Sequence, residues 1–180
     1  MDSQTYLGEK ITAGGRLAVP YALMAVLFAL NIVALPYPMS GTIKAPFILM
    51  TLYYWSIYRP SLLPPALVFL AGLAMDFLSG LPVGLNAALL IALRWFVSDQ
   101  RRFLTGQPFI VIWLGFSVLN LLAEIVQWGV FGLTALSWPP IAGFLPSVFL
   151  GFALFPAVCI LLSLTHKALP AQDRAFGRKD

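Results

Sequence analysis

Three ionisable side chains lie inside long apolar runs of the sequence: Asp76, Arg94 and Glu124. A charge in an apolar, water-poor segment is costly, and by default it marks a candidate functional group. Either carboxylate could serve a ligand, a proton or a partner protein, or could simply tie neighbouring helices together. Arg94 has a simpler interpretation, because its long stem can run along a helix and carry the guanidinium to the aqueous interface.

Asp76 shares one face of a predicted helix with Phe69, Gly72 and Ser79. The four positions are spaced i, i+3, i+7 and i+10, so they form a single stripe. Gly72 would let another backbone approach closely, and Asp76 and Ser79 could bond across that contact. The stripe could therefore be a structural tie or a docking face for a partner, and both interpretations remain open.

A tight turn follows Asp76, with Gly80, Pro82 and Gly84 at its key positions. Glycine adopts positive φ cheaply and proline fixes its own φ, so this composition favours a sharp reversal of the chain. A second apolar run begins directly after the turn. We therefore expect a helical hairpin that carries one acid close to its tip.

Glu124 lies in the middle of another apolar run, with Asn120 four residues before it and Gln127 three residues after it. The three side chains share one polar helix face, and lipid cannot satisfy such a face. It should point into the bundle, into a wet cavity or onto a partner helix. An interhelical hydrogen-bond network and a site for a small molecule or partner helix are equally compatible with this pattern.

Catalytic and metal-binding patterns are not expected. The one histidine, His166, lies in the polar tail, and the one cysteine, Cys159, lies in an apolar run as a small packing residue. A Ser-His or His-metal site within the apolar segments is thereby excluded, and no phosphate-binding or dinucleotide motif occurs. We expect no enzymatic activity and no cofactor.

Composition indicates an integral membrane protein. Of its 180 residues 60% are hydrophobic and only 10% are charged, whereas a soluble domain carries roughly 25% charged residues. The net charge of +4 does not indicate nucleic-acid binding, because the basic residues are scattered at the ends of apolar runs. The sequence predicts an all-α integral membrane protein.

Six apolar runs are candidates for transmembrane helices. The second is short, and Tyr53, Tyr54, Trp55 and Tyr58 crowd its end in a pattern typical of an aromatic belt at the membrane interface. It predicts a short span, with a re-entrant segment as the alternative. Pro146 and Pro156 predict kinks in the last run. The runs cover residues 17–35, 45–58, 62–78, 85–97, 108–133 and 141–164.

Charge supports six spans with both termini in the cytoplasm. With the N-terminus inside, ten of the eleven basic residues fall on the inner side and only Lys44 falls outside, as the positive-inside rule requires. We expect a lead at residues 1–16, a transmembrane domain at 17–165 and a basic tail at 166–180. The tail and the loop that carries Arg101 and Arg102 would face anionic lipid or cytoplasmic partners. The internal basic residues on that side are Arg59, Arg94, Arg101 and Arg102.

A spaced pattern runs through the centre of the chain: Tyr54-Trp55, Arg59-Pro60, Gly72-Leu73, Asp76, Gly80, Pro82 and Gly84. In this order the sequence resembles the bacterial rod shape-determining protein MreD family. The resemblance implies an inner-membrane, non-enzymatic scaffold or regulator of the cell-wall elongation machinery. It also implies association with MreC, with the MreB filament, and with RodA and its penicillin-binding transpeptidase. The bundle would bind the single transmembrane helix of a partner, and MreC is the partner that we expect.

A second function class fits the same outline. In span number and size the expected six-helix bundle is similar to the substrate-binding subunits of energy-coupling-factor vitamin transporters. Asn120, Glu124 and Gln127 would then line a ligand pocket near the outer side. The outer segment around Trp138 offers little of the polarity that such a ligand cap needs, so the scaffold interpretation is preferred.

Overall fold

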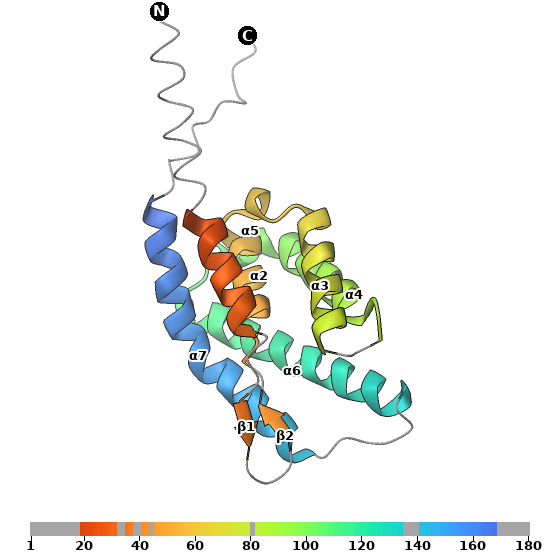
Figure 1. Cartoon of the computed structure of the whole chain (residues 1–180). Helices are drawn as coiled ribbons and strands as arrows, with labels where there is room; N and C mark the ends of the chain where they lie inside the picture. The colour runs from red at the N-terminus through yellow and green to blue at the C-terminus, as the bar shows by residue number, and fades with distance from the viewer. Residues whose placement is uncertain are drawn as a thin grey trace, which may run out of the picture.

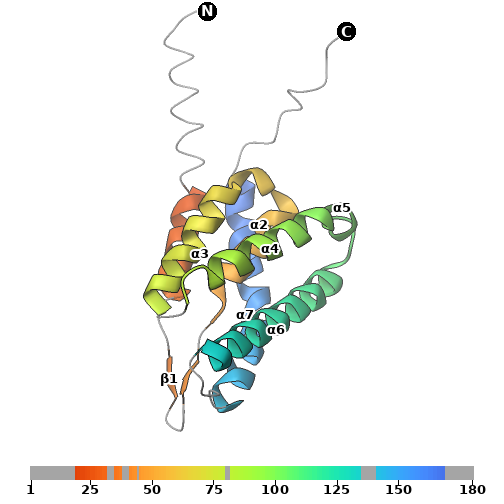
Figure 2. The same cartoon turned by 90° about the vertical axis from the view of Figure 1, so that its right-hand side faces the viewer.

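The computed structural model describes residues 19–31, 35–37, 41–43, 45–79, 82–134 and 141–168. The expected cytoplasmic lead, most of the basic tail, Lys44 and the turn residue Gly80 lie outside the described residues. Helices dominate the described part, and they occur within all six apolar runs (Figures 1 and 2). They are a first helix Val19–Asn31, α2 Phe47–Tyr58, α3 Pro65–Ser79, α4 Leu85–Asp99, α6 Phe109–Thr134 and α7 Ile141–Ala168.

Three short elements lie between these helices. A 3-10 turn, η1 Pro60–Leu62, separates α2 from α3, so α3 begins three residues later than the sequence predicts, at Pro65. Proline suits the first position of a helix because its missing N–H would have no intrahelical partner there. A one-turn helix, α5 Arg101–Leu104, lies inside the predicted charged loop.

The third short element is a β-ribbon before α2, where the sequence predicted only the end of the first helix and a loop. Strands β1 Leu35–Tyr37 and β2 Gly41–Ile43 pair antiparallel, with Leu35 opposite Ile43 and Tyr37 opposite Gly41. The ribbon projects from one end of the bundle (Figure 1). Leu35, the last residue of the predicted first helix, therefore belongs to a strand.

Helix α2 is the centre of the bundle, and it corrects the prediction of an aromatic belt. Nine of its twelve residues are buried, and Tyr53, Tyr54 and Trp55 are 2%, 6% and 0% exposed. These rings pack inside the protein and do not face the membrane interface. The helix is about 18 Å long at 1.5 Å per residue, which is too short to cross a hydrocarbon core of about 30 Å unaided. It contacts α4, α6 and α7, which surround it.

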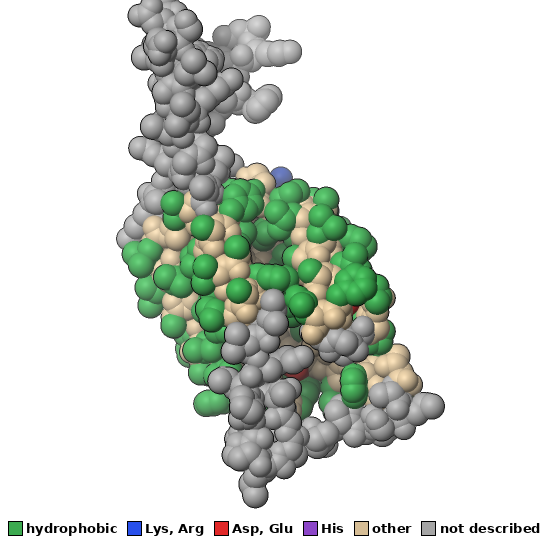
Figure 3. Space-filling model, viewed as in Figure 1, with side chains coloured by type: hydrophobic (Ala, Val, Ile, Leu, Met, Phe, Trp, Pro, Cys, Tyr) green, Lys and Arg blue, Asp and Glu red, His purple; other side chains and the backbone are tan. Residues whose placement is uncertain are grey.

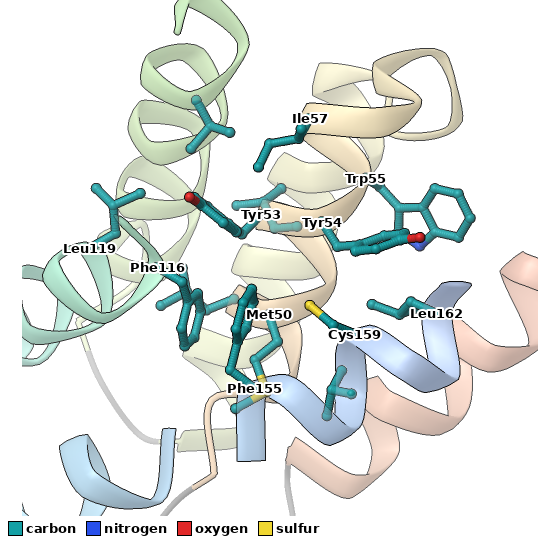
Figure 4. Close-up of a cluster of buried hydrophobic side chains, with 14 of the residues drawn as sticks. Met50, Tyr53, Tyr54, Trp55, Ile57, Phe116, Leu119, Phe155, Cys159 and Leu162 are labelled. Atoms are coloured by element: carbon teal, nitrogen blue, oxygen red, sulfur yellow. The ribbon is translucent and has the colours of Figure 1, made fainter. Parts of the chain in front are cut away.

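The aromatic core joins α2 to the last two helices (Figure 4). The ring of Tyr53 meets Phe116 and Phe155 edge-on at centroid distances of 5.7 and 5.8 Å, and Phe116 stacks on Phe155 at 4.1 Å. Such contacts contribute about 0.5–1.5 kcal/mol each beyond area burial. The Tyr53 hydroxyl donates a hydrogen bond of 3.0 Å to the Ile112 carbonyl, so its polar end is satisfied in the core.

Helix α7 contains Pro146 and Pro156, the two prolines at which the sequence predicts kinks. A proline in a helix leaves the carbonyl four residues earlier without its usual donor. For Pro156 that carbonyl belongs to Phe152, and the indole N–H of Trp113 on α6 donates to it at 3.0 Å. The proline thereby creates a tie between α6 and α7.

The outer faces of the helices are apolar (Figure 3). Large hydrophobic side chains are exposed along the first helix, α3, α4, α6 and α7, among them Leu70, Trp95, Val118 and Phe149. A soluble monomer seldom exposes continuous apolar surface on this scale. Helix α6 and residues 144–165 of α7 are also long and apolar enough to cross a membrane. The surface therefore suits contact with lipid.

Helices α3 and α4 form the predicted hairpin, and they touch at Gly72. A Cβ built on Gly72 would collide with the Cα of Ala87 and lie 2.7 Å from the Ala87 nitrogen. Only glycine fits where the backbone of α4 passes this closely. Phe69, placed on the same stripe by its spacing, is 47% exposed and lies outside the contact.

We predict that Gly72→Ala destabilises the protein by about 1–3 kcal/mol, because the added methyl group forces the two helix backbones apart. Unfolding in mixed micelles of mild detergent and SDS measures the change. Gly129→Ala on α6 is the matched control, since a Cβ there meets nothing within 4 Å and alanine favours helix. Equal stability losses in the two variants would contradict the close-packing explanation.

Candidate functional site

The predicted site residues contribute to a layer of buried polar groups near the turn between α3 and α4. This polar layer consists of five residues from four helices, namely the first helix, α3, α4 and α6: Asn31, Asp76, Asn86, Asn120 and Gln127. Four of the five are less than 9% exposed, and Gln127 is half-buried. A buried polar group is costly unless it is hydrogen-bonded, so the partners of each one decide what the layer can do.

Asp76 is completely buried and accepts two backbone hydrogen bonds from the start of α4. The N–H groups of Gly84 and Asn86 both donate to its carboxylate at 2.8 Å. Helix α4 cannot cap itself, because its N-cap residue is Gly84 at φ 99°, which has no side chain to accept the first N–H groups. Asp76 supplies that cap from the end of α3, and its negative charge also suits the positive end of the α4 dipole.

Asn86 extends this contact to α6. Its backbone N–H is held by Asp76, and its side-chain oxygen accepts a hydrogen bond of 3.1 Å from the Gln127 amide. One carboxylate and two side-chain amides therefore connect α3, α4 and α6 in one continuous chain of hydrogen bonds. Sequence reasoning included Gln127 but omitted Asn86, although an asparagine in the first turn of a predicted helix was a usable signal.

Asn31 caps α2 in the same manner as Asp76 caps α4. Its side-chain oxygen accepts the N–H of Ile48 at 3.1 Å, and its amide donates to the sulfur of Met75 at 3.5 Å. Helix α2 begins after Pro46, which gives no side-chain cap of its own. Asn31 is a polar residue inside the first apolar run, and its partner could not be read from spacing.

Asn120 lies where α6, α7 and the start of α2 meet. Its amide donates to the Val148 carbonyl at 3.2 Å, and a Cβ on Gly151 would collide with that amide and lie 3.0 Å from Pro46. Within the described residues its side-chain oxygen has no hydrogen-bond partner. Gly151 thus makes room for Asn120 at a three-way contact.

The predicted face of α6 is therefore divided between two neighbours. Asn120 is directed to α7 and Gln127 to α4, while Glu124 between them is partly exposed. The side chain of Ser79, which shared the stripe with Asp76, lies outside the described residues. The structure brings Asp76 and Gln127 together through Asn86, and it keeps Asn120 in a separate contact.

The basic residues lie at the opposite end of the α3–α4 hairpin from Asp76. The Arg94 guanidinium Nε donates to the Leu63 carbonyl at 2.7 Å, and that of Arg101 donates to the Ile57 carbonyl at 2.9 Å. The Ile57 carbonyl lies in the last turn of α2 and the Leu63 carbonyl lies at the C-cap of η1, so both lack intrahelical donors. Arg102 is exposed on α5, and Arg59 is the C-cap residue of α2.

The arrangement is one of structural ties, and it offers no evident reaction chemistry. The carboxylate of Asp76 is completely buried and both of its oxygens accept backbone N–H groups of α4, so it is directed at the helix end and not at a substrate. Among the described residues, no three His, Cys, Asp or Glu side chains are grouped so that they could hold a metal ion. The polar layer sets the positions of the helix ends within apolar surroundings.

Comparison with known proteins gives one match. The family model described as rod shape-determining protein MreD matches residues 15–166, which is most of the 180-residue chain. No curated protein and no solved structure matches the chain significantly.

We predict that Asp76→Ala destabilises the protein by about 2–6 kcal/mol, because two backbone N–H groups, one buried and one partly buried, lose their acceptor and each costs roughly 1–3 kcal/mol. Asp76→Asn keeps one acceptor oxygen and should lose less. The measurement is unfolding of the purified full chain in detergent–SDS mixtures. Asp99→Ala is the control, since Asp99 is exposed at the end of α4, and a loss there as large as at Asp76 would refute the capping role.

Proposed function

The chain belongs to the family of the rod shape-determining protein MreD, and from this premise we propose that it is a non-enzymatic membrane scaffold or regulator of the bacterial cell-wall elongation complex. Membership of this membrane-protein family indicates a role in rod shape determination. The proposed action is to bind MreC in the inner membrane and, with it, RodA, the penicillin-binding transpeptidase and the MreB filament. The observation that carries the proposal is the family match over residues 15–166.

The structure supports a binding role over a catalytic one. The buried polar groups described above are engaged in helix caps and interhelical bonds, while the outer faces of the helices present large apolar side chains. Helices associate in a membrane through close packing and a few polar contacts. A scaffold of this kind would therefore recognise a partner's transmembrane helix with its outer faces.

One outer face suits such a helix, and we assign MreC to it. Val118 is 58% exposed on α6, and it borders two apolar grooves, one of about 630 Å³ toward α7 and one of about 350 Å³ toward α4 and α5. A ridge flanked by grooves is the surface onto which another helix packs. Leu121, Leu122 and Ile125 continue this ridge toward Glu124, which would add one polar contact.

The orientation that we propose has both termini in the cytoplasm and six spans. The end of the bundle with Arg94, Arg101 and Arg102 would then be the inner end, as the positive-inside rule requires. The exposed Arg102 would meet anionic lipid head groups or cytoplasmic partners. The β-ribbon and the turn at Gly84 would lie at the outer end.

A vitamin-type transporter subunit is the alternative function. It would need Asn120, Glu124 and Gln127 to face a ligand pocket. The amides of Asn120 and Gln127 instead donate to Val148 and Asn86. Both donors are therefore used within the protein, and the structure supports this alternative less than the sequence did.

We predict that the protein co-purifies with MreC from its own genome in mild detergent, and that Val118→Trp lowers MreC retention by at least about fivefold, the effect of a roughly 1 kcal/mol steric cost. Val26→Trp on the first helix is the matched control, because Val26 is similarly exposed at 53%. Glu124→Leu in the same assay measures the polar contact. If the folded wild-type protein retains no MreC, the scaffold mechanism is wrong.

We also predict the topology by cysteine labelling in a Cys159→Ala background. A cysteine at Thr105, which is exposed after α5, should react with a membrane-impermeant maleimide only after the inner membrane is opened. A cysteine at Ser40 should react in intact spheroplasts. Labelling of both positions, or of neither, before the membrane is opened would contradict the proposed orientation.

A further inference from the structure

An apolar slot separates the first helix from α3. It encloses about 420 Å³, with Met24 and Phe28 on one wall, Leu67 and Ala71 on the other, and Thr51 of α2 and Leu90 of α4 at its base. In Figure 3 the surface is hollowed between these two helices. The slot lies on a different side of the molecule from the α6 ridge, so nothing about it depends on partner binding.

Two polar ties hold the walls of the slot at its ends. The Tyr21 hydroxyl donates to the Leu62 carbonyl at 3.1 Å at one end, and the Asn31 amide donates to the Met75 sulfur at 3.5 Å at the other. Ten residues of helix separate Tyr21 from Asn31, which is about 15 Å. The walls are therefore fixed in position, and the gap between them is a lasting feature of the fold.

The lining offers a ligand no free hydrogen-bond donor. Tyr21 and Thr51 are its polar side chains, and their hydroxyls already donate to the carbonyls of Leu62 and Phe47, which leaves only the hydroxyl oxygens as acceptors. A sugar, nucleotide, vitamin or peptide backbone would lose most of its hydrogen bonds with water and would not replace them here. The occupant must be almost wholly apolar.

Access to the slot is lateral, from the apolar surface. Ala25 and Leu70 at its rim are exposed, and Leu70 is 63% exposed among the lipid-suited side chains of α3. An occupant therefore enters from the hydrocarbon region of the bilayer. Water is a poor occupant, because an apolar cavity gives it none of the two to four polar partners that it needs.

The volume of the slot decides whether a protein helix or a hydrocarbon chain can fill it. A helix about 10 Å across and 15 Å long occupies roughly 1,200 Å³, about three times the volume available. A methylene chain is a rod of about 4 Å van der Waals diameter, so 15 Å of it fills about 190 Å³. The slot has room for one or two such chains, whereas a helix could only lie across its mouth and would leave it unfilled.

We propose that this slot is a binding site for the hydrocarbon chain of a bilayer lipid, seated between the first helix and α3. The chain would supply the van der Waals contacts that the two walls do not make with each other, and so would hold the first helix against α2. It would differ from the lipid around the other helices in being retained on dilution.

The test is photolabelling of the full chain in vesicles of phosphatidylethanolamine and phosphatidylglycerol. A phospholipid with a diazirine in the middle of one acyl chain is included, and the protein is extracted in mild detergent with excess unlabelled lipid before irradiation. Mass spectrometry of the peptides should find the adducts concentrated on residues 24–28 and 67–71. Adducts spread evenly over all exposed helices, or lost on extraction, would overturn the proposal.

Two variants fill the slot from opposite walls, and one matched variant does not. Ala71→Phe and, at the rim, Ala25→Phe should each lower labelling of these peptides by at least about fivefold. Ala88→Phe on the exposed face of α4 should leave it unchanged. Full labelling of a folded Ala25→Phe protein would exclude a lipid chain from the slot. A dimer that dissociates only in the two filled variants would also exclude it, and would assign the slot to a second copy of the chain.

Discussion

The ends of helices impose the constraint on which this structure depends. In an apolar surrounding, the first N–H groups and last carbonyls of a helix cannot turn to water, so the protein itself must supply their partners. Helices α2 and α4 start at Pro46 and Gly84, which cannot cap them. The acceptors come instead from the ends of the preceding helices, Asn31 and Asp76. Tyr21, Arg94 and Arg101 donate to carbonyls at the ends of α2 and η1 in the same way. Trp113 donates to the α7 carbonyl that Pro156 leaves without its usual donor.

The sequence predicted the helices well because apolar runs and prolines delimit them directly. The hairpin of α3 and α4 and the close approach at Gly72 followed from glycine spacing and the turn residues. The environment of α2 did not follow, and its aromatic residues were misread as an interfacial belt. Tyr53, Tyr54 and Trp55 are buried and Tyr58 is partly buried, and the order of residues in a segment does not reveal whether lipid or protein surrounds it.

For the candidate site, sequence selected residue types but could not assign partners. Asp76 and Gln127 were recognised as polar groups in apolar runs, yet the residue that joins them, Asn86, was missed. Asn120 and Gln127 were placed on one face by their spacing, and tertiary packing directs them to different helices. A face defined by helical periodicity is wide enough to meet two neighbours, so spacing alone leaves the choice open. The functional conclusion accordingly rests on family membership. The geometry contributes the location of the exposed surfaces that a partner could bind.

The short, enclosed helix α2 has a consequence for biosynthesis. Its twelve residues leave the ribosome before α4, α6 and α7, which are its main neighbours in the finished bundle. A segment of this length is below the roughly 17 residues of the shortest independent spans, so the insertion machinery has little reason to release it alone into lipid. It must wait, in the translocon or beside the first helix, until the C-terminal half has been made. The slowest step of membrane assembly should therefore be the enclosure of α2, and truncations that remove α7 should leave a chain that quality-control proteases recognise.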